Sequence, residues 1–161
     1  MPQQKIFKLF IDQHTSIISK ICRAYSNDEQ EFEDYYQEVT LQLWRSFNTF
    51  RGESKASTWV YRIALNVCLS QIRKRKKRIK TTVLEHTQIK DEGNNNEKEV
   101  QIANLYVAIK KIKETDRALI LLYLDDKSYK EIAEIMGLTV SNVGAKINRI
   151  KTQLKKLIPY G

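Results

Sequence analysis

The stretch Tyr129-Lys-Glu-Ile-Ala-Glu-Ile-Met136, followed by Gly137-Leu138-Thr139, decides the fold of the second half of this chain. It has the pattern of a short helix, a tight glycine turn and the start of a second helix, which is helix-turn-helix geometry. Ala133 is small where the two helices approach, and Gly137 can adopt the positive φ that ends a helix. A helical hairpin that only packs is the competing interpretation, but hairpins rarely join this turn to an exposed polar face.

The segment after the turn carries an apolar stripe at helical spacing. The stripe consists of Val143, Ile147, Ile150, Leu154 and Leu157. If it faces the core, a polar set near the helix start stays open to a DNA major groove, namely Asn142, Lys146, Asn148, Arg149 and Lys151. Arginine pairs with guanine and asparagine with adenine, so Arg149 and Asn148 are the leading base readers. Both lysines are expected on phosphate, and a solvated surface position is the alternative for each residue.

The rest of the chain predicts an all-α protein made of two small helical domains. Helical periodicity predicts helices over residues 5–25, 31–47, 59–78, 100–112, 116–124 and 129–136, with Ser57 or Thr58 capping the third. Both prolines lie outside these segments, at positions 2 and 159. Residues 81–98 lose the periodicity and have the composition of a flexible linker. We therefore expect a first domain over residues 1–80, the linker, and a second domain over 99–161.

The charge of the chain favours a polyanionic partner. The formal net charge is +9, and Lys and Arg gain affinity for phosphates by releasing condensed counterions. The excess lies mainly in residues 1 to 80, with 15 basic and 8 acidic side chains, against 13 and 11 beyond them. Charge alone does not separate nucleic acid from an anionic membrane. Since no stretch approaches the roughly 20 apolar residues of a membrane span and no signal peptide is evident, we expect a cytoplasmic protein.

Neither a metal site nor a catalytic site is expected. Cys22 and Cys68 lie among apolar residues without metal-ligand spacing, so we interpret both as buried reduced thiols. A magnesium-dependent nuclease could use Glu33, Asp34 and Glu38. However, only the last two of these carboxylates share a helix face, and no histidine or lysine base accompanies them. We expect no enzyme activity, no cofactor and no small-molecule substrate.

The predicted second helix carries an acidic surface within a basic domain. Its core side is expected at Phe32, Tyr36, Val39, Leu43 and Phe47, and its acidic side chains are Asp28, Glu29, Glu31, Glu33, Asp34 and Glu38. DNA would repel these carboxylates. A protein partner with a basic docking surface explains them better, with Leu41 and Trp44 supplying apolar contact. The alternative is a solvated face that only aids solubility.

The predicted third helix combines basic and aromatic side chains. It ends in the basic run Arg73–Arg78, preceded on one side by Arg62, Asn66 and Ser70. This combination suits unpaired DNA, because cations follow the backbone while rings stack on exposed bases. Trp59 could stack in this way, and is equally expected in the core.

Three segments resemble motifs of bacterial RNA polymerase sigma factors, in the same order and spacing. Residues 33–44 (EDYYQEVTLQLW) resemble the helix that grips the clamp helices of the largest polymerase subunit. Residues 50–66 (FRGESKASTWVYRIALN) are similar to the segment that opens and reads the minus-10 element, and residues 128–140 with the following helix resemble the minus-35 reader. The long non-conserved and middle domains of housekeeping sigma factors are absent. The chain therefore resembles the extracytoplasmic-function class of the sigma-70 family, with a region 2 domain and a region 4 domain.

The resemblance implies three sets of site residues. Polymerase contacts are implied at Asp34, Gln37, Glu38, Leu41 and Trp44. Minus-10 contacts are implied at Ser54, Lys55, Ser57, Thr58, Trp59, Arg62, Asn66 and Arg73. Minus-35 contacts are implied at Asn142, Lys146, Asn148, Arg149 and Lys151.

The resemblance also implies partners. They are core RNA polymerase, through the clamp helices of its largest subunit and the flap of the second, promoter DNA, and a membrane-associated anti-sigma factor. The rival interpretation is a stand-alone helix-turn-helix regulator, which leaves the acidic helix and residues 50–66 without a role.

Two departures from the family pattern stand out. Ile112-Lys113 replaces a common Leu-Pro, which we expect to alter only the start of a helix. Gly144-Ala145 replaces a basic residue followed by serine or threonine, which removes DNA-contacting side chains and favours an unusual or shape-based minus-35 preference.

Overall fold

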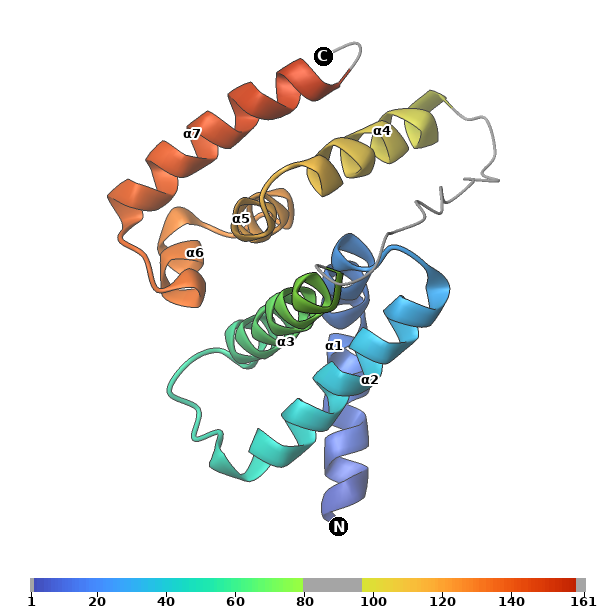
Figure 1. The fold of residues 1–161 in the computed structure, drawn as a ribbon. Coiled ribbons are helices and arrows are strands. Elements are labelled where there is room, and N and C mark those ends of the chain that lie inside the picture. The colour runs from blue at the N-terminus through green and yellow to red at the C-terminus, as the bar shows by residue number, and fades with distance from the viewer. Residues whose placement is uncertain (1, 80–96, 159–161) are drawn as a thin grey trace. The chain divides into compact units, whose positions relative to one another are not determined.

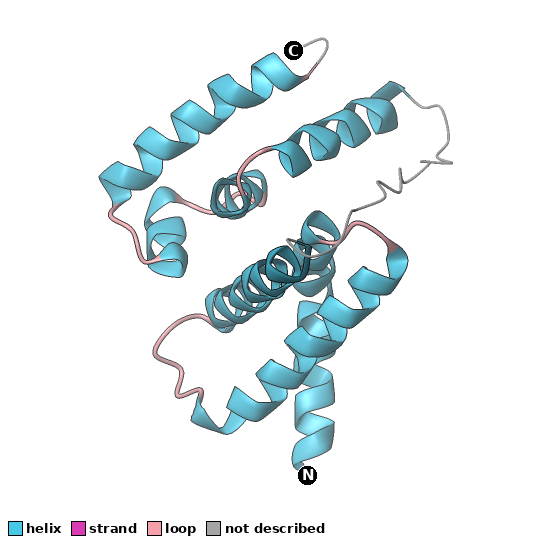
Figure 2. Ribbon diagram, viewed as in Figure 1, coloured by secondary structure: helices cyan, strands magenta, loops and turns pink. Residues whose placement is uncertain are grey.

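The structure is a computed structural model that describes residues 2–79 and 97–158. Within these ranges the regular secondary structure consists of seven α-helices and one short 3-10 helix, and no strand occurs (Figure 2). The predicted all-α class is confirmed. The chain divides into two compact units, Met1–Thr87 and Gln88–Gly161. The predicted linker over residues 81–98 lies outside the described residues except for its last two positions, which belong to a helix.

The first unit is a three-helix bundle (Figure 1). It comprises α1 (Gln3–Tyr25), α2 (Glu29–Ser46), the 3-10 helix η1 (Phe47–Thr49) and α3 (Ala56–Ile79), and each α-helix packs against the other two. Helix α2 begins where the Asp28 carboxylate accepts a hydrogen bond from the Glu31 amide at 2.8 Å. The centre of the bundle is apolar and includes Ile18, Cys22, Val39, Leu43, Val60, Ala64 and Cys68.

The buried side of α2 differs from the predicted one. Tyr35, Val39 and Leu43 are buried, whereas Phe32 and Tyr36 are only half-buried. The prediction placed Tyr36 in the core because two adjacent tyrosines fit the same spacing. In the folded chain the ring of Phe32 lies at the edge of the bundle, 3.8 Å below the Arg23 guanidinium.

Helix α3 starts earlier than predicted. It begins at Ala56, and the Trp59 amide already donates to the Lys55 carbonyl at 3.2 Å. The prediction that Ser57 or Thr58 caps this helix is therefore wrong, since both lie in its first turn. The error arose because Lys55 is not a residue type that signals a helix start.

The second unit contains α4 (Glu97–Lys111), α5 (Glu114–Leu124), α6 (Tyr129–Met136) and α7 (Val140–Leu157). The predicted stripe on α7 is buried at Val143, Ile147, Ile150 and Leu154 and half-buried at Leu157. A buried arginine was not foreseen. Arg117 of α5 donates to the carbonyls of Ile109 at 3.2 Å and Lys110 at 2.8 Å, so it satisfies the end of α4.

The two cysteines face each other in the core of the first unit. Cys22 and Cys68 are buried free thiols, as predicted. A hydrogen bond with Cys22, together with burial, holds the pKa of the Cys68 thiol well above its usual range. The Cys68 thiol therefore stays protonated and acts as a small apolar side chain. Separately, no helix among the described residues is long and apolar enough to cross a membrane.

Candidate protein and nucleic-acid interfaces

A groove of about 850 Å³ runs between α1 and α2. Four of the five residues predicted to contact the polymerase line it, namely Asp34, Gln37, Leu41 and Trp44. Their spacing of three, four and three residues keeps them on one side of α2. Leu41 is 39% exposed and Trp44 is 37% exposed, so the groove presents two large apolar side chains to solvent next to each other on one side of α2.

Aromatic residues of α1 support the groove. The ring of Phe7 meets Trp44 edge-on at 5.0 Å and Phe47 at 5.2 Å. The contact with Phe7 holds the Trp44 indole while leaving part of its surface open. The sequence pattern did not single out Phe7 as a partner of Trp44, because this contact depends on how the two helices pack.

The fifth predicted residue, Glu38, lies elsewhere. It lines a separate pocket of about 330 Å³ between α2 and α3, and it accepts a hydrogen bond from Gln42 at 3.2 Å. Asn66 and Lys74 of α3 line the same pocket. The structure thus divides the predicted polymerase set, and brings Glu38 beside a residue predicted to read the minus-10 element.

The loop before α3 is held by an aromatic cluster. Trp59 stacks on Phe50 with ring centres 4.7 Å apart and meets Phe10 edge-on at 5.7 Å. Trp59 is consequently half-buried, and Thr58 is only 4% exposed. The predicted minus-10 set therefore includes one residue, Thr58, whose side chain is turned into the bundle.

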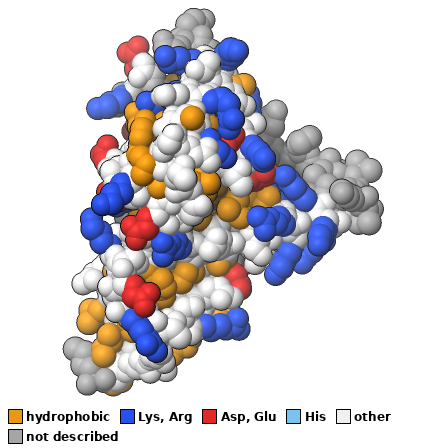
Figure 3. Space-filling model, turned by 90° about the vertical axis from the view of Figure 1, so that its left-hand side faces the viewer, with side chains coloured by type: hydrophobic (Ala, Val, Ile, Leu, Met, Phe, Trp, Pro, Cys, Tyr) orange, Lys and Arg blue, Asp and Glu red, His pale blue; other side chains and the backbone are white. Residues whose placement is uncertain are grey.

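The outer side of α3 gathers the remaining helical members of that set. Arg62, Asn66 and Arg73 follow one another at four and seven residues and so share one side of the helix. Asn66 and Arg73 are exposed and Arg62 is half-exposed. Figure 3 shows one face of the molecule, on which blue lysine and arginine side chains are more widespread than red acidic ones.

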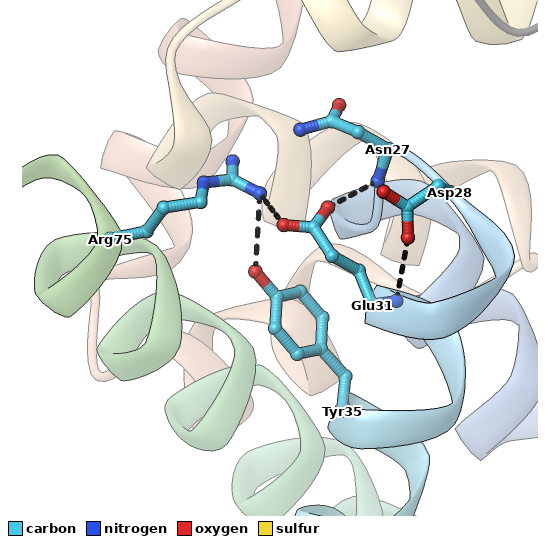
Figure 4. Close-up of polar contacts among 5 residues, drawn as sticks. All are labelled: Asn27, Asp28, Glu31, Tyr35 and Arg75. Atoms are coloured by element: carbon cyan, nitrogen blue, oxygen red, sulfur yellow. Dashed lines mark hydrogen bonds and ion pairs between the residues drawn. The ribbon is translucent and has the colours of Figure 1, made fainter. Parts of the chain in front are cut away.

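The basic run at the end of α3 is interrupted by a side chain that points inward. Arg75 Nη1 pairs with Glu31 Oε2 and donates to the Tyr35 hydroxyl at 3.4 Å (Figure 4). Burial raises the pKa of Tyr35 to about 12, against the opposing charge of Arg75. The tyrosine is therefore a neutral hydrogen-bonding partner at ordinary pH.

Both ends of α6 have strong caps that fix the helix-turn-helix. Ser128 Oγ accepts a hydrogen bond from the Glu131 amide at 3.1 Å, and the Glu131 carboxylate accepts one from the Ser128 amide. The two bonds form a capping box. Gly137 has φ 69° and ψ 37°, as the predicted turn requires. Thr139 Oγ1 then accepts from the Asn142 amide at 3.1 Å to start α7.

The predicted readers on α7 do not all share one side. Asn142, Lys146 and Arg149, spaced by four and three residues, lie together, while Asn148 and Lys151 lie on another side. Arg149 Nη2 is 3.8 Å from the Asp116 carboxylate of α5, and its side chain remains 65% exposed.

Lys151 and Gly144 both contact tyrosine rings. Lys151 Nζ lies 4.1 Å from the centre of the Tyr123 ring, and a hydrogen bond with Tyr123 raises the pKa of the lysine. A Cβ atom at Gly144 would lie 3.4 Å from the Tyr129 ring of α6. Position 144 therefore faces a neighbouring helix, and Ala145 beside it is exposed.

The carboxylates considered for a nuclease are separated. Asp34 opens to the groove between α1 and α2, whereas Glu38 opens to the pocket between α2 and α3. Within the part of the chain that the structure describes, no group of three His, Cys, Asp or Glu residues could hold a metal ion.

Comparison with known proteins identifies both units. Residues 10–78 match the family model for Sigma-70 region 2, and residues 102–154 match that for Sigma-70, region 4. The chain is 30% identical to the ECF RNA polymerase sigma factor SigW of Bacillus subtilis, over 95% of this chain and 89% of that protein. It is 26% identical to the RNA polymerase sigma-H factor of Pseudomonas aeruginosa, over 96% and 87%.

A solved structure has the same fold. The sigma factor RpoE of Bartonella quintana, solved in complex with the anti-sigma factor NepR, superposes with a TM-score of 0.76 at 21% identity, over 95% of this chain and 96% of that one. A stand-alone regulator would account for the second unit only, so it is the weaker explanation. The chain belongs to the extracytoplasmic-function sigma factors of the sigma-70 family, proteins that direct RNA polymerase to specific promoters.

Proposed function

We propose that this sigma factor binds core RNA polymerase through α2 and reads promoter DNA with α3 and α7. The observation that carries the proposal is the open apolar groove beside α2, edged by acidic side chains in a basic protein. A DNA-binding surface would not place carboxylates there. A protein partner with a basic, partly apolar helical surface fits both its charge and its shape.

The proposed polymerase contact centres on Leu41 and Trp44. These two side chains can bury apolar area on docking, while Asp34 and Gln37 supply charge and hydrogen bonds beside them. Phe7 holds the Trp44 ring in place before the partner arrives, which lowers the entropy cost of docking. Glu38 would lie at the margin of this interface. The resemblance of residues 33–44 to the family helix suggests the clamp helices of the largest polymerase subunit as the partner, with the flap of the second subunit meeting the other unit.

The minus-10 element is proposed to follow the outer side of α3. Arg62 and Arg73 would contact backbone phosphates, and Asn66 between them would face a base. Ser54, Lys55 and Ser57 at the loop and helix start could add contacts. Because Trp59 is stacked on Phe50 and Thr58 is buried, we assign these two residues to holding the loop rather than to stacking on DNA bases.

The minus-35 element is proposed to receive the start of α7 in its major groove. Arg149 and Asn148 are the proposed base readers, approached from two sides of the helix. Asn142 and Lys146 would contact phosphate next to Arg149. Lys151 lies over the Tyr123 ring, so we propose that it stays on the helix flank and adds positive charge. The exposed methyl of Ala145 offers only an apolar contact, for example to a thymine methyl.

We further infer that the protein is not itself an enzyme, acts in the cytoplasm and is controlled by an anti-sigma factor that covers one of these surfaces. Two solved proteins of this fold support the last point. RpoE of Bartonella quintana is bound to NepR, and CnrH is bound to the cytosolic domain of CnrY.

Co-purification with core polymerase tests the proposal. We expect tagged wild type to retain core polymerase and Asp34→Lys to lose it. Asp12→Lys is the matched control, because Asp12 is exposed on α1 outside the groove and undergoes a charge reversal of the same kind. Glu38→Lys should lose less binding than Asp34→Lys. Absence of binding by a folded wild type, or tight sequence-specific duplex binding without polymerase, would favour the stand-alone regulator instead.

A further inference from the structure

Arg75 differs from every other member of the basic run Arg73–Arg78. The other five side chains are exposed, whereas the Arg75 side chain is only 30% exposed. The helix explains this difference. Arg75 follows the buried Cys68 and Ile72 at seven and three residues, so it continues the side of α3 that packs against the other helices.

Glu31 anchors this arginine and the start of α2 together. Its Oε2 pairs with Arg75 Nη1, while its Oε1 accepts a hydrogen bond from the backbone amide of Asn27 at 2.7 Å (Figure 4). The Glu31 amide in turn donates to Asp28, the cap of the helix. One carboxylate therefore joins the first turn of the polymerase-docking helix to the basic end of the DNA-contacting helix.

We propose that Arg75 is a positioning residue, which orients the basic end of α3 through Glu31 and does not itself bind DNA phosphate. The inference rests on the proposed function, because it concerns how the basic end of α3, which is proposed to contact DNA, is held in place. A phosphate that approached the Arg75 guanidinium would also meet the carboxylates of Glu31 and Asp28. Those two charges repel a phosphate, and the guanidinium already pairs with one of them.

The charge of Glu31 gives a test in which the two possible roles have opposite signs. If Arg75 bound phosphate directly, Glu31→Gln would release the arginine and remove a nearby negative charge, so DNA would bind more tightly. If Arg75 positions the run, Glu31→Gln loosens the end of α3 and DNA binds more weakly. Arg75→Gln should then weaken binding to the same extent as Glu31→Gln.

The experiment assembles the full-length chain with core polymerase and titrates a fluorescent oligothymidine single strand across a range of salt concentrations, with core polymerase alone as background. We expect Glu31→Gln and Arg75→Gln to weaken binding roughly two- to thirtyfold without changing the salt slope. The control Arg73→Gln should lower the slope by about 0.7, the value for one lost phosphate on a single strand. The swapped pair Glu31→Arg with Arg75→Glu should recover part of the affinity.

Thermal unfolding of the same variants separates folding from positioning. Glu31→Gln and Arg75→Gln should each lower the Tm of the first unit by several degrees, so binding is measured below all transitions. Tighter binding by Glu31→Gln, or unchanged binding by both variants, would overturn the positioning role. If the wild-type chain adds no strand binding to core polymerase, the proposed function fails, and the positioning role falls with it.

Discussion

The two glycines Gly137 and Gly144 should respond to alanine with opposite signs. Gly137 lies in the turn at φ 69°, a conformation that an L side chain adopts at a cost of roughly 1–2 kcal/mol. Alanine also lowers the conformational entropy of the unfolded chain, which stabilises the folded state by about 0.4–1 kcal/mol. No heavy atom lies within 4 Å of a Cβ built at Gly137, so crowding adds nothing. The net expectation for Gly137→Ala is a loss of about 1 kcal/mol.

Gly144 lies within α7 at ordinary helical angles. Replacing a mid-helix glycine by alanine stabilises a helix by roughly 0.8–1 kcal/mol. The new Cβ would touch the Tyr129 ring at 3.4 Å, which is an acceptable contact. We therefore expect Gly144→Ala to raise the stability of the second unit by somewhat less than 1 kcal/mol. A change of 1 kcal/mol corresponds to about 4–8 °C in Tm for a domain of this size.

The placement of the tryptophans makes the assay specific. Trp44 and Trp59 both belong to the first unit, so their fluorescence reports its unfolding, whereas far-UV circular dichroism reports both units. Both alanine variants should shift the dichroism transition and leave the fluorescence transition unchanged. A higher stability of Gly137→Ala would refute the assignment of backbone strain to Gly137. A lower stability of Gly144→Ala would refute the assignment of simple helix propensity to Gly144.

Three further outcomes are expected. Ser128→Ala removes the capping box of α6 and should cost the second unit about 1 kcal/mol in the dichroism assay, whereas Ser128→Asp should be nearly neutral. Lys113→Pro should stabilise the same unit by about 0.4–1 kcal/mol, because Lys113 already has φ −57°; a lower Tm would show that Ile112 cannot accept the proline. Tyr35 has its pKa raised from 10.0 to about 12, so its neutral form contributes stability that is complete below pH 10 and is lost as pH rises towards 12. Urea unfolding at pH 9 and pH 11, followed by tryptophan fluorescence, should show about 1 kcal/mol more loss in wild type than in Tyr35→Phe, and equal losses would contradict the burial of the phenol.

The sequence pattern predicted the elements whose periodicity is unambiguous. The stripe on α7 steps by four and three residues over its whole length, and all but its last member are buried. The turn at Gly137 was predictable because one residue type dominates that conformation. The buried side of α2 was less so, since Tyr35 and Tyr36 fit the spacing equally well and only the packing of three helices decides between them.

The site was harder to predict than the fold, because a site depends on which side chains pair across helices. The members of the run Arg73–Arg78 look equivalent in sequence, yet Arg75 turns inward. A signal was present, since Arg75 extends the buried spacing of Ala64, Cys68 and Ile72, and a charged residue at such a position requires an internal partner. The separation of Asp34 from Glu38 carried no such signal, because residues four apart on one helix ordinarily share a surface.

The internal pairs also correct the acidic surface that the sequence predicted on α2. Six carboxylates were assigned to it, but Asp28 caps the helix and Glu31 pairs with Arg75. Glu29 Oε2 lies 2.6 Å from Arg23 Nη1 in an exposed ion pair. At a distance, the two opposite charges of this pair largely cancel. Glu38 lies at the separate pocket between α2 and α3. The negative charge at the edge of the groove is therefore that of Glu33 and Asp34.

This concentration of charge has a consequence for how polymerase binding should depend on salt. Two carboxylates beside exposed Leu41 and Trp44 form a small acidic edge around an apolar centre. Charges at a rim mainly accelerate association and are screened within about 10 Å at 0.1 M salt, whereas buried apolar contacts mainly slow dissociation. Asp34→Asn should thus reduce the association rate with core polymerase and its salt dependence, while Trp44→Ala should raise the dissociation rate. Stopped-flow binding measures both rates, and a Trp44→Ala effect confined to association would contradict the apolar centre.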